Sequence, residues 1–229
     1  MDSLIILQSD NIENDYRLIK QCRTLEKNSF SPHILYFHIH NSENLNGLLN
    51  GKFPYSRKKL ITRRLFKSGR LIVLKLLEQW IKSLLYIFET KSKNICVHDD
   101  RSIGLIFLLY PLKKLRFIKT ISWDLRELPI SFLNSKISRL VLKLSFIICD
   151  SISSANKERK EVLIKELSLK ENISSKIYTI CNFPDKSFVD INKKSLPEAL
   201  RNWLSDSEYI YIQSPTEPQR YFFNSISSL

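Results

Sequence analysis

NICVHDDRSIGLIFLLYPLKKLRFIKTISWDLRE, residues 94–127, contains two short apolar runs on either side of a longer apolar segment. The runs at 94–98 and 117–122 have the length and the β-branched content of strands, and the segment at 102–110 has the pattern of a helix. A strand, a helix and a strand in this order indicate two parallel strands, because a parallel pair needs a long crossover. This stretch therefore predicts one strand–helix–strand unit of a parallel sheet.

The same alternation continues in both directions along the chain. Further strands are expected at residues 4–8, 33–38, 146–149, 176–179 and 209–213. Further helices are expected at residues 15–27, 58–89, 131–144, 154–168 and from 218 to the end. Alternating strands and helices are typical of an α/β protein with helices on both faces of the sheet. We predict a doubly wound, Rossmann-like, mostly parallel sheet.

Polar residues follow most of the expected strands. In open parallel sheets, ligands bind outside the carboxyl ends of the strands, so these residues are the candidate site. They are Ser9, Asp10, Asn11, His40, Asn41, His98, Asp99, Asp100, Trp123, Asp124, Arg126, Glu127, Asp150, Ser151 and Asn182. The chain has only 4 glycines and lacks the glycine-rich phosphate loops. This composition argues against a nicotinamide dehydrogenase or a P-loop nucleotidase.

Five short motifs, in order along residues 1–190, resemble the N-terminal domain of a family 4-like glycosyltransferase of the GT-B type. They are Asn14–Lys20, which resembles the opening of the family's first helix; Val97-His98-Asp99; Ile121–Leu128; Cys149–Ser153 followed by Asn156–Arg159; and Ile180–Asp185. In the third motif, Arg126 stands where the family has a histidine.

This resemblance implies a domain plan. Residues 1–190 would form the acceptor-binding domain, and residues 191–207 a linker. Residues 208–229 would supply the first strand and helix of a nucleotide-sugar-binding domain. One strand and one helix are too short to bury a core of their own. We therefore expect either a longer chain or a separate partner chain to supply the rest of that domain.

The resemblance also implies transfer of a sugar from a nucleotide-sugar donor to a glycan or lipid-linked acceptor, in polysaccharide or glycolipid synthesis. Arg126 would stabilise negative charge on a phosphate. Asp124 or Glu127 would orient or deprotonate the acceptor hydroxyl, and His98 is a second acid–base candidate. The expected substrate-binding residues are Ser9, Asp10, Asn11, Arg17, Asp99 and Asn182. No cofactor is expected, because the nucleotide-sugar is itself a substrate. No metal is expected either, because no metal site is apparent in the sequence and enzymes of this type usually need none.

Each candidate also has a purely structural interpretation. Asp124 and Glu127 could cap the helix near residue 131 or pair with Arg126, and His98 could bond the backbone. Arg17 could pair with Asp15 or with the cleft wall, and Asn182 could fasten an interdomain turn.

The chain is strongly basic, with 36 Lys and Arg against 23 Asp and Glu, and this balance predicts a polyanionic partner. The basic residues gather among apolar ones between Lys52 and Lys82, a pattern that suits an anionic membrane surface. The expected membrane surface comprises Arg57, Lys58, Lys59, Arg63 and Arg64. Its alternative is a solvated face of a helix packed on the core.

No apolar run approaches the roughly 20 residues that a spanning helix needs, and the N-terminus lacks the features of a secretory signal. We therefore expect a cytoplasmic protein that is peripheral on the inner face of the membrane. Three function classes stay open: a glycosyltransferase domain, a non-catalytic subunit that binds acceptor or membrane beside a partner chain, and a basic nucleic-acid-binding protein. Nucleic acid ranks last, because no recognition motif for it is present.

Overall fold

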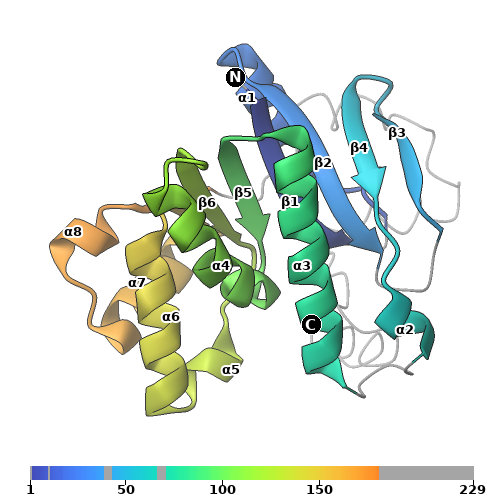
Figure 1. The fold of residues 1–229 in the computed structure, drawn as a ribbon. Helices are drawn as coiled ribbons and strands as arrows, with labels where there is room; N and C mark the ends of the chain where they lie inside the picture. Colours follow the sequence, from blue (N-terminus) through green and yellow to red (C-terminus); the bar gives the residue numbers. More distant parts are fainter. Residues whose placement is uncertain (1, 10, 39–42, 66–70, 181–229) are drawn as a thin grey trace, which may run out of the picture. The chain divides into compact units, whose positions relative to one another are not determined.

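A computed structural model describes residues 2–9, 11–38, 43–65 and 71–180 of the chain (Figure 1). The first compact unit spans Met1–Phe183. The predicted linker at 191–207, the predicted strand at 209–213 and the predicted helix from 218 lie outside the described residues. So do Asp10, His40, Asn41 and Asn182.

The described part contains eight strands and, among longer and shorter helices, five of more than ten residues. The strands are β1 (Asp2–Ser9), β2 (Ser31–His38), β3 (Leu45–Leu49), β4 (Phe53–Arg57), β5 (Asn94–His98), β6 (Thr120–Leu125), β7 (Ser151–Ser154) and β8 (Ile177–Thr179). The helices are α1 (Tyr16–Lys27), α2 (Ile61–Leu65), α3 (Ile72–Thr90), η1 (Asp100–Ser102), α4 (Ile103–Lys114), α5 (Ile130–Leu133), α6 (Lys136–Ile148), α7 (Lys157–Leu167) and α8 (Glu171–Ser174).

These strands form one sheet in the order β3-β4-β2-β1-β5-β6-β7-β8. All neighbouring pairs are parallel except β3 with β4. The chain moves from β1 to β2 in one direction and from β5 to β8 in the other. The strand order thus reverses between β1 and β5, and such a switch point is where doubly wound sheets bind ligands. The predicted doubly wound α/β fold is confirmed.

Alternating residues of the strands point to opposite faces of the sheet and pack into two hydrophobic cores. On one face, Ile5 and Leu7 of β1 and Ile34 of β2 pack against Leu18 and Cys22 of α1. The other face packs against α3, α4, α6 and α7, which lie together on one side of the sheet in Figure 1. Both faces of the central strands are therefore covered, and the polar side chains gather at the strand ends.

Polar caps fix where several helices begin. Asp15 accepts a hydrogen bond from the Leu18 amide at the start of α1, Ser135 accepts from Ser138 before α6, and Asn156 accepts from Arg159 before α7. Such caps satisfy amides that have no partner within the helix. The cap of α1 also places Asp15 beside the carboxyl end of β1.

Two of the expected strands were misplaced. The strand expected at 117–122 is β6 at Thr120–Leu125, so Trp123 and Asp124 belong to the strand itself. The strand expected at 146–149 is wrong, because α6 continues to Ile148 and buries Phe146 at helical spacing from Leu142. The true strand, β7, has the sequence SISS and turns only Ile152 and Ser154 toward the core.

The segment expected as one helix over 58–89 is also wrong. Residues 58–60 have no regular secondary structure, α2 follows, and α3 begins at Ile72. Ahead of them, β3 and β4 form a hairpin that the strand pattern missed. Its turn holds Asn50 and Gly51 at φ 52 and φ 66, as expected of an Asn-Gly hairpin turn.

Candidate functional site

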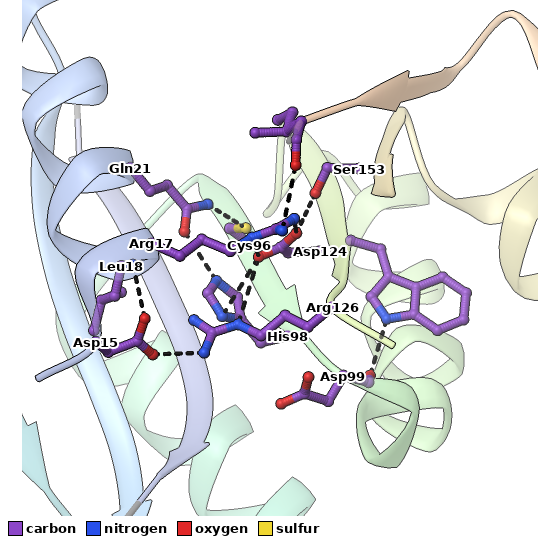
Figure 2. A network of polar contacts seen from close by, with 12 residues as sticks. Asp15, Arg17, Leu18, Gln21, Cys96, His98, Asp99, Asp124, Arg126 and Ser153 are labelled. Carbon is purple, nitrogen blue, oxygen red and sulfur yellow. Dashed lines mark hydrogen bonds and ion pairs between the residues drawn. The ribbon is translucent and has the colours of Figure 1, made fainter. Parts of the chain in front are cut away.

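The candidate site lies at the carboxyl ends of β1, β5 and β6, at the switch point of the sheet. Helix α1 contributes Asp15, Arg17 and Gln21, β5 contributes His98, and the β6 segment contributes Asp124 and Arg126 (Figure 2). The sequence predicted that residues following separate strands would converge here. For His98, Asp99, Asp124 and Arg126, the structure bears this out.

Asp124 is the centre of the polar network. Arg17 binds it with two nitrogens, Nε to Oδ2 at 3.0 Å and Nη2 to Oδ1, and Ser153 donates to Oδ1. Both side chains of the ion pair are largely buried, at 11% exposed for Arg17 and 5% for Asp124. Burial alone would raise the pKa of Asp124, but the charge of Arg17 and the hydrogen bonds from Arg17 and Ser153 lower it overall. Asp124 is thus an ionised anchor that holds Arg17 in place.

Arg126 is held from the opposite side. Its Nη1 donates to Asp15 Oδ2 at 2.5 Å, while its Nε lies 3.7 Å from Asp124 Oδ2. Within the described part of the chain, its buried Nε and Nη2 have no hydrogen-bond partner. A buried donor without a partner is costly, so these two groups are positioned to receive an acceptor atom from a ligand.

His98 is a buried, neutral imidazole. Burial is the largest cause that lowers its pKa, to about 4, and the charge of Arg126 acts in the same direction. Its Nε2 lies 3.0 Å from Gln21 Oε1, and this contact assigns the proton to Nε2 and leaves Nδ1 as an acceptor. Nδ1 lies 3.8 Å from Asp124 Oδ2 and has no hydrogen-bond partner among the described residues. In this tautomer, His98 keeps a buried acceptor without a partner beside Asp124.

Asp99 combines backbone strain with a perturbed carboxyl. It adopts φ 63 and ψ 168, a conformation that normally requires glycine. Its carbonyl accepts from Trp123 Nε1 at 2.9 Å and its amide donates to the Asp124 carbonyl at 3.0 Å, so neighbouring groups hold the strained backbone. Burial raises the pKa of its carboxyl to about 6. Backbone strain of this kind is concentrated at functional sites.

Arg126 lines two pockets. One pocket, of about 310 Å³, is lined by His98, Asp99, Arg126 and Glu127 together with Gln8 and Arg101. The other, of about 370 Å³, is lined by Ser9, Asn11, Asp15, Arg17 and Arg126. The first also includes Asp100 and Ser102 of η1, and Ser102 is the N-cap of α4, whose helix dipole favours an anion. The carboxylates of Asp99, Asp100 and Glu127 in the same pocket act against an anion.

The remaining predicted residues have varied positions. Ser9 and Asn11 line the second pocket, and exposed Glu127 lies on the first. Asp150 lies at the opposite end of the sheet, where it accepts from the Ile121 amide. Arg17 pairs with Asp124 rather than with Asp15, and Asp124 caps no helix.

The sequence does not reveal the contacts of three further residues of the network. Gln21 lies on α1 one turn after Arg17 and bonds both His98 and Cys96. Ser153 belongs to the fourth motif, but the strand that carries it, β7, is expected earlier in the chain. Asp15 belongs to the first motif and is a possible partner of Arg17, but its contact with Arg126 spans 111 residues.

The basic residues expected to form a membrane surface are partly engaged within the chain. Arg57 donates to the Glu43 carbonyl, Lys59 pairs with the Glu43 carboxylate at 3.0 Å, and Arg63 donates to the His38 carbonyl. Lys58 lies over the Tyr86 ring, 5.2 Å from its centroid. The side chain of Arg64 lies outside the described structure. These cations therefore help to fasten the segment between β4 and α2.

Across the described residues, no three His, Cys, Asp or Glu side chains are arranged to hold a metal ion. The same residues include no helix that is both long and apolar enough to cross a membrane.

Solved structures reveal what the fold is similar to. The catalytic domain of starch synthase IV from Arabidopsis thaliana, bound to ADP and acarbose, matches 81% of this chain and 52% of its own, at TM-score 0.57 and 11% identity. Sucrose-phosphate synthase from Thermosynechococcus elongatus matches 79% of this chain and 48% of its own, at TM-score 0.56 and 8% identity. This chain therefore has the fold of the N-terminal domain of a GT-B glycosyltransferase.

The fold is also shared with a different class of enzyme. UDP-GlcNAc 2-epimerase from Neisseria meningitidis, bound to UDP-GlcNAc, matches 78% of this chain and 45% of its own, at TM-score 0.50 and 14% identity. The chain thus spans about half the length of these proteins. No protein-family model and no curated protein sequence matches it.

Proposed function

We propose that this chain is the acceptor-binding half of a glycosyltransferase that uses a nucleotide-sugar donor. The observation that carries the proposal is Arg126, which presents two buried donors without partners at the switch point of a GT-B-like domain. A guanidinium with free donors binds phosphate oxygens in a defined geometry. The resemblance of the motifs and the glycosyltransferases among the structural matches support the same class of reaction.

The network suggests a division of roles. Arg126 binds a phosphate, either the leaving diphosphate of the donor or a phosphate of the acceptor, where it would stabilise developing negative charge. Asp124 is a positioning residue, because Arg17 and Ser153 engage its carboxylate. His98 Nδ1 or the exposed carboxylate of Glu127 accepts the proton of, or a hydrogen bond from, the acceptor hydroxyl. Ser9 and Asn11 contact substrate in the second pocket.

The finer part of the proposal concerns the acceptor. We infer a glycan or lipid-linked acceptor in polysaccharide or glycolipid synthesis, from the resemblance of the motifs. The donor-binding domain would come from further residues or from a separate chain. The non-catalytic subunit is the alternative within this scheme, and it predicts acceptor binding without affinity for a nucleotide-sugar.

The test uses the chain together with whatever donor-binding chain co-purifies with it. Labelled UDP-sugars and ADP-sugars are incubated with lipid and glycan acceptors, and transfer is measured beside release of nucleotide. We expect transfer, and we expect Arg126→Gln to lower turnover by at least about tenfold. Lys157→Gln is the matched control, because Lys157 is an exposed cation of α7 that pairs with Glu161 at 3.8 Å.

Three outcomes would contradict the proposal. Full turnover in a folded Arg126→Gln variant would remove Arg126 from the site. Epimerisation of a nucleotide-sugar without any acceptor would assign the chain to the other enzyme class with this fold. Acceptor binding without affinity for any nucleotide-sugar in the complete assembly would favour the non-catalytic subunit.

A further inference from the structure

Helix α3 carries apolar side chains on both of its sides. Its inner side buries Tyr86 and Ile87 together with the polar Gln79 and Ser83, and Trp80 and Leu84 pack against the same core. Its outer side carries a stripe at intervals of three and four residues, whose members are between 40% and 63% exposed. The stripe comprises Val73, Leu77, Ile81, Leu85 and Phe88. A helix that only covers a core has a polar outer side.

Helix α6 repeats this feature. It buries Leu142, Ser145 and Phe146 against the core, and its outer side carries a second apolar stripe. The members of that stripe, 40% to 78% exposed, are Ile137, Leu140, Leu144 and Ile147. Because an exposed apolar stripe occurs on two helices, we do not attribute it to chance.

Both stripes belong to one surface. The buried sides of α3, α4 and α6 share a single core with the same face of the sheet, and α4 packs between the other two helices (Figure 1). The outer sides of α3 and α6 therefore point away from the sheet in the same general direction, with half-exposed Leu108 of α4 between them. We call this surface, made of the two stripes and Leu108, the outer helical face. Large apolar side chains exposed together on one side of a domain often mark an interaction site.

The segment of the sequence that supplies these helices is strongly positive. Between Arg57 and Cys149, 20 Lys and Arg stand against 6 Asp and Glu. Lys75 and Lys82 lie on α3, and Lys136, Arg139 and Lys143 lie on α6. Of the acidic residues on α3, Glu78 is engaged by Lys82 at 2.8 Å and by the amides of Ile61 and Thr62. On the two helices, five cations thus stand against two anions, Glu78 and Glu89.

We propose that the outer helical face docks on the surface of an anionic lipid bilayer. Aliphatic and aromatic side chains enter the boundary between headgroups and acyl chains, while lysines and arginines contact anionic headgroups. A second copy of this chain fits poorly, because it would bring the same positive charge to the contact. The surface is made of other residues than the one expected between Arg57 and Arg64.

The inference rests on the proposed function only in that a lipid-linked acceptor would be met at the same surface. Vesicle binding is measured without sugar transfer, so either proposal can fail while the other stands.

The experiment is co-sedimentation of the full chain with vesicles of phosphatidylcholine containing roughly 30% phosphatidylglycerol, beside vesicles of phosphatidylcholine alone. The test variant is Leu77→Glu/Ile81→Glu/Leu85→Glu in the α3 stripe. The matched control is Leu45→Glu/Leu48→Glu/Tyr178→Glu, three equally exposed apolar residues on the edge strands β3 and β8. Circular dichroism and sedimentation velocity establish folding and oligomeric state for each protein.

We expect the wild type and the control to bind the anionic vesicles, and the α3 variant to bind at least about tenfold more weakly. Three results would overturn the proposal: no binding by the wild type, equal binding by the folded α3 variant, or a wild-type dimer that the α3 substitutions dissociate in the absence of lipid. If the α3 variant fails to fold, the same comparison with Ile137→Glu/Leu140→Glu/Leu144→Glu on α6 decides the question.

Discussion

At the scale of single residues, the site is an alternation of opposite charges across separate elements. Asp15 holds Arg126, Arg126 lies beside Asp124, and Asp124 holds Arg17. Removing one partner of a buried ion pair leaves the other charge uncompensated, which typically costs about 3–5 kcal/mol. The network therefore fixes α1 against the ends of β5 and β6 as well as shaping the pockets.

Two titrating residues in this network act on stability with opposite signs. His98 has a pKa lowered to about 4, so the stability it contributes is present above its unfolded pKa of about 6.5 and is lost as the pH falls toward 4. Asp99 has a pKa raised to about 6, so the stability it contributes is present below its unfolded pKa of about 3.9 and is lost as the pH rises through 6. The two effects oppose each other in the wild type.

The substitution Asp99→Asn removes the titration of Asp99 and leaves that of His98. At pH 7 the substitution removes an ionised carboxylate whose burial destabilises the folded state. At pH 4 it replaces a carboxyl group that is already protonated. We expect the free energy of unfolding of Asp99→Asn, relative to wild type, to be higher at pH 7 than at pH 4 by about 1–3 kcal/mol, measured by urea denaturation. Any effect of asparagine on the strained backbone is the same at both pH values and cancels. If the difference in free energy of unfolding between Asp99→Asn and wild type is the same at both pH values, the Asp99 carboxyl does not titrate in this range.

At the scale of elements, the contact between α3 and α4 depends on one glycine. A Cβ at Gly104 would overlap the six-membered ring of Trp80, whose Nε1 donates to the Arg101 carbonyl at 3.1 Å. Glycine is unfavourable inside a helix, so its presence here reflects the close approach of the indole. Through this approach, α3 borders the first pocket with Gln79.

We expect Gly104→Ala to destabilise the protein by about 1–3 kcal/mol, although alanine is the better helix former. The measurement is urea denaturation of the single variants and of the double variant with Trp80→Leu. Because the smaller side chain leaves room for the new methyl group, Gly104→Ala is expected to cost less in the Trp80→Leu background. An equal cost in both backgrounds would refute the steric explanation.

At the scale of the whole molecule, the positive charge and the apolar stripes occur in the same part of the chain. A nucleic-acid-binding protein relies mainly on charge, so its affinity falls steeply with salt, by about 1000-fold or more between roughly 50 and 200 mM for six or more phosphate contacts. Docking through apolar stripes adds a hydrophobic contribution to the binding free energy, and salt does not screen this contribution.

We therefore expect binding to anionic vesicles to fall by less than about tenfold over this range of salt, whereas any binding to duplex DNA falls far more steeply. Both are measured on the wild-type chain in parallel titrations. Equal steepness for vesicles and DNA would show that charge alone attracts the chain to both, and it would revive the nucleic-acid interpretation.

Sequence patterns were informative wherever a single element carried its own signal. Strands β1, β2, β5 and β8 and helices α1, α4 and α7 fall close to the expected ranges, because apolar periodicity and caps are local properties. The convergence of His98, Asp99, Asp124 and Arg126 was predictable as well, because parallel strands bring their carboxyl ends to one edge. The Asn-Gly pair at 50–51 could also have revealed the hairpin of β3 and β4.

Tertiary structure decided what no local pattern encodes. A serine-rich strand such as β7 forms because its neighbours complete the ladder on both sides, and an apolar run such as 146–149 has no period that separates helix from strand. The pairings of Arg126 with Asp15 and of Arg17 with Asp124 join residues more than 100 positions apart. The outward side of α3 was equally undetermined, because an amphipathic pattern shows that a helix has two sides, and only packing decides which side is buried.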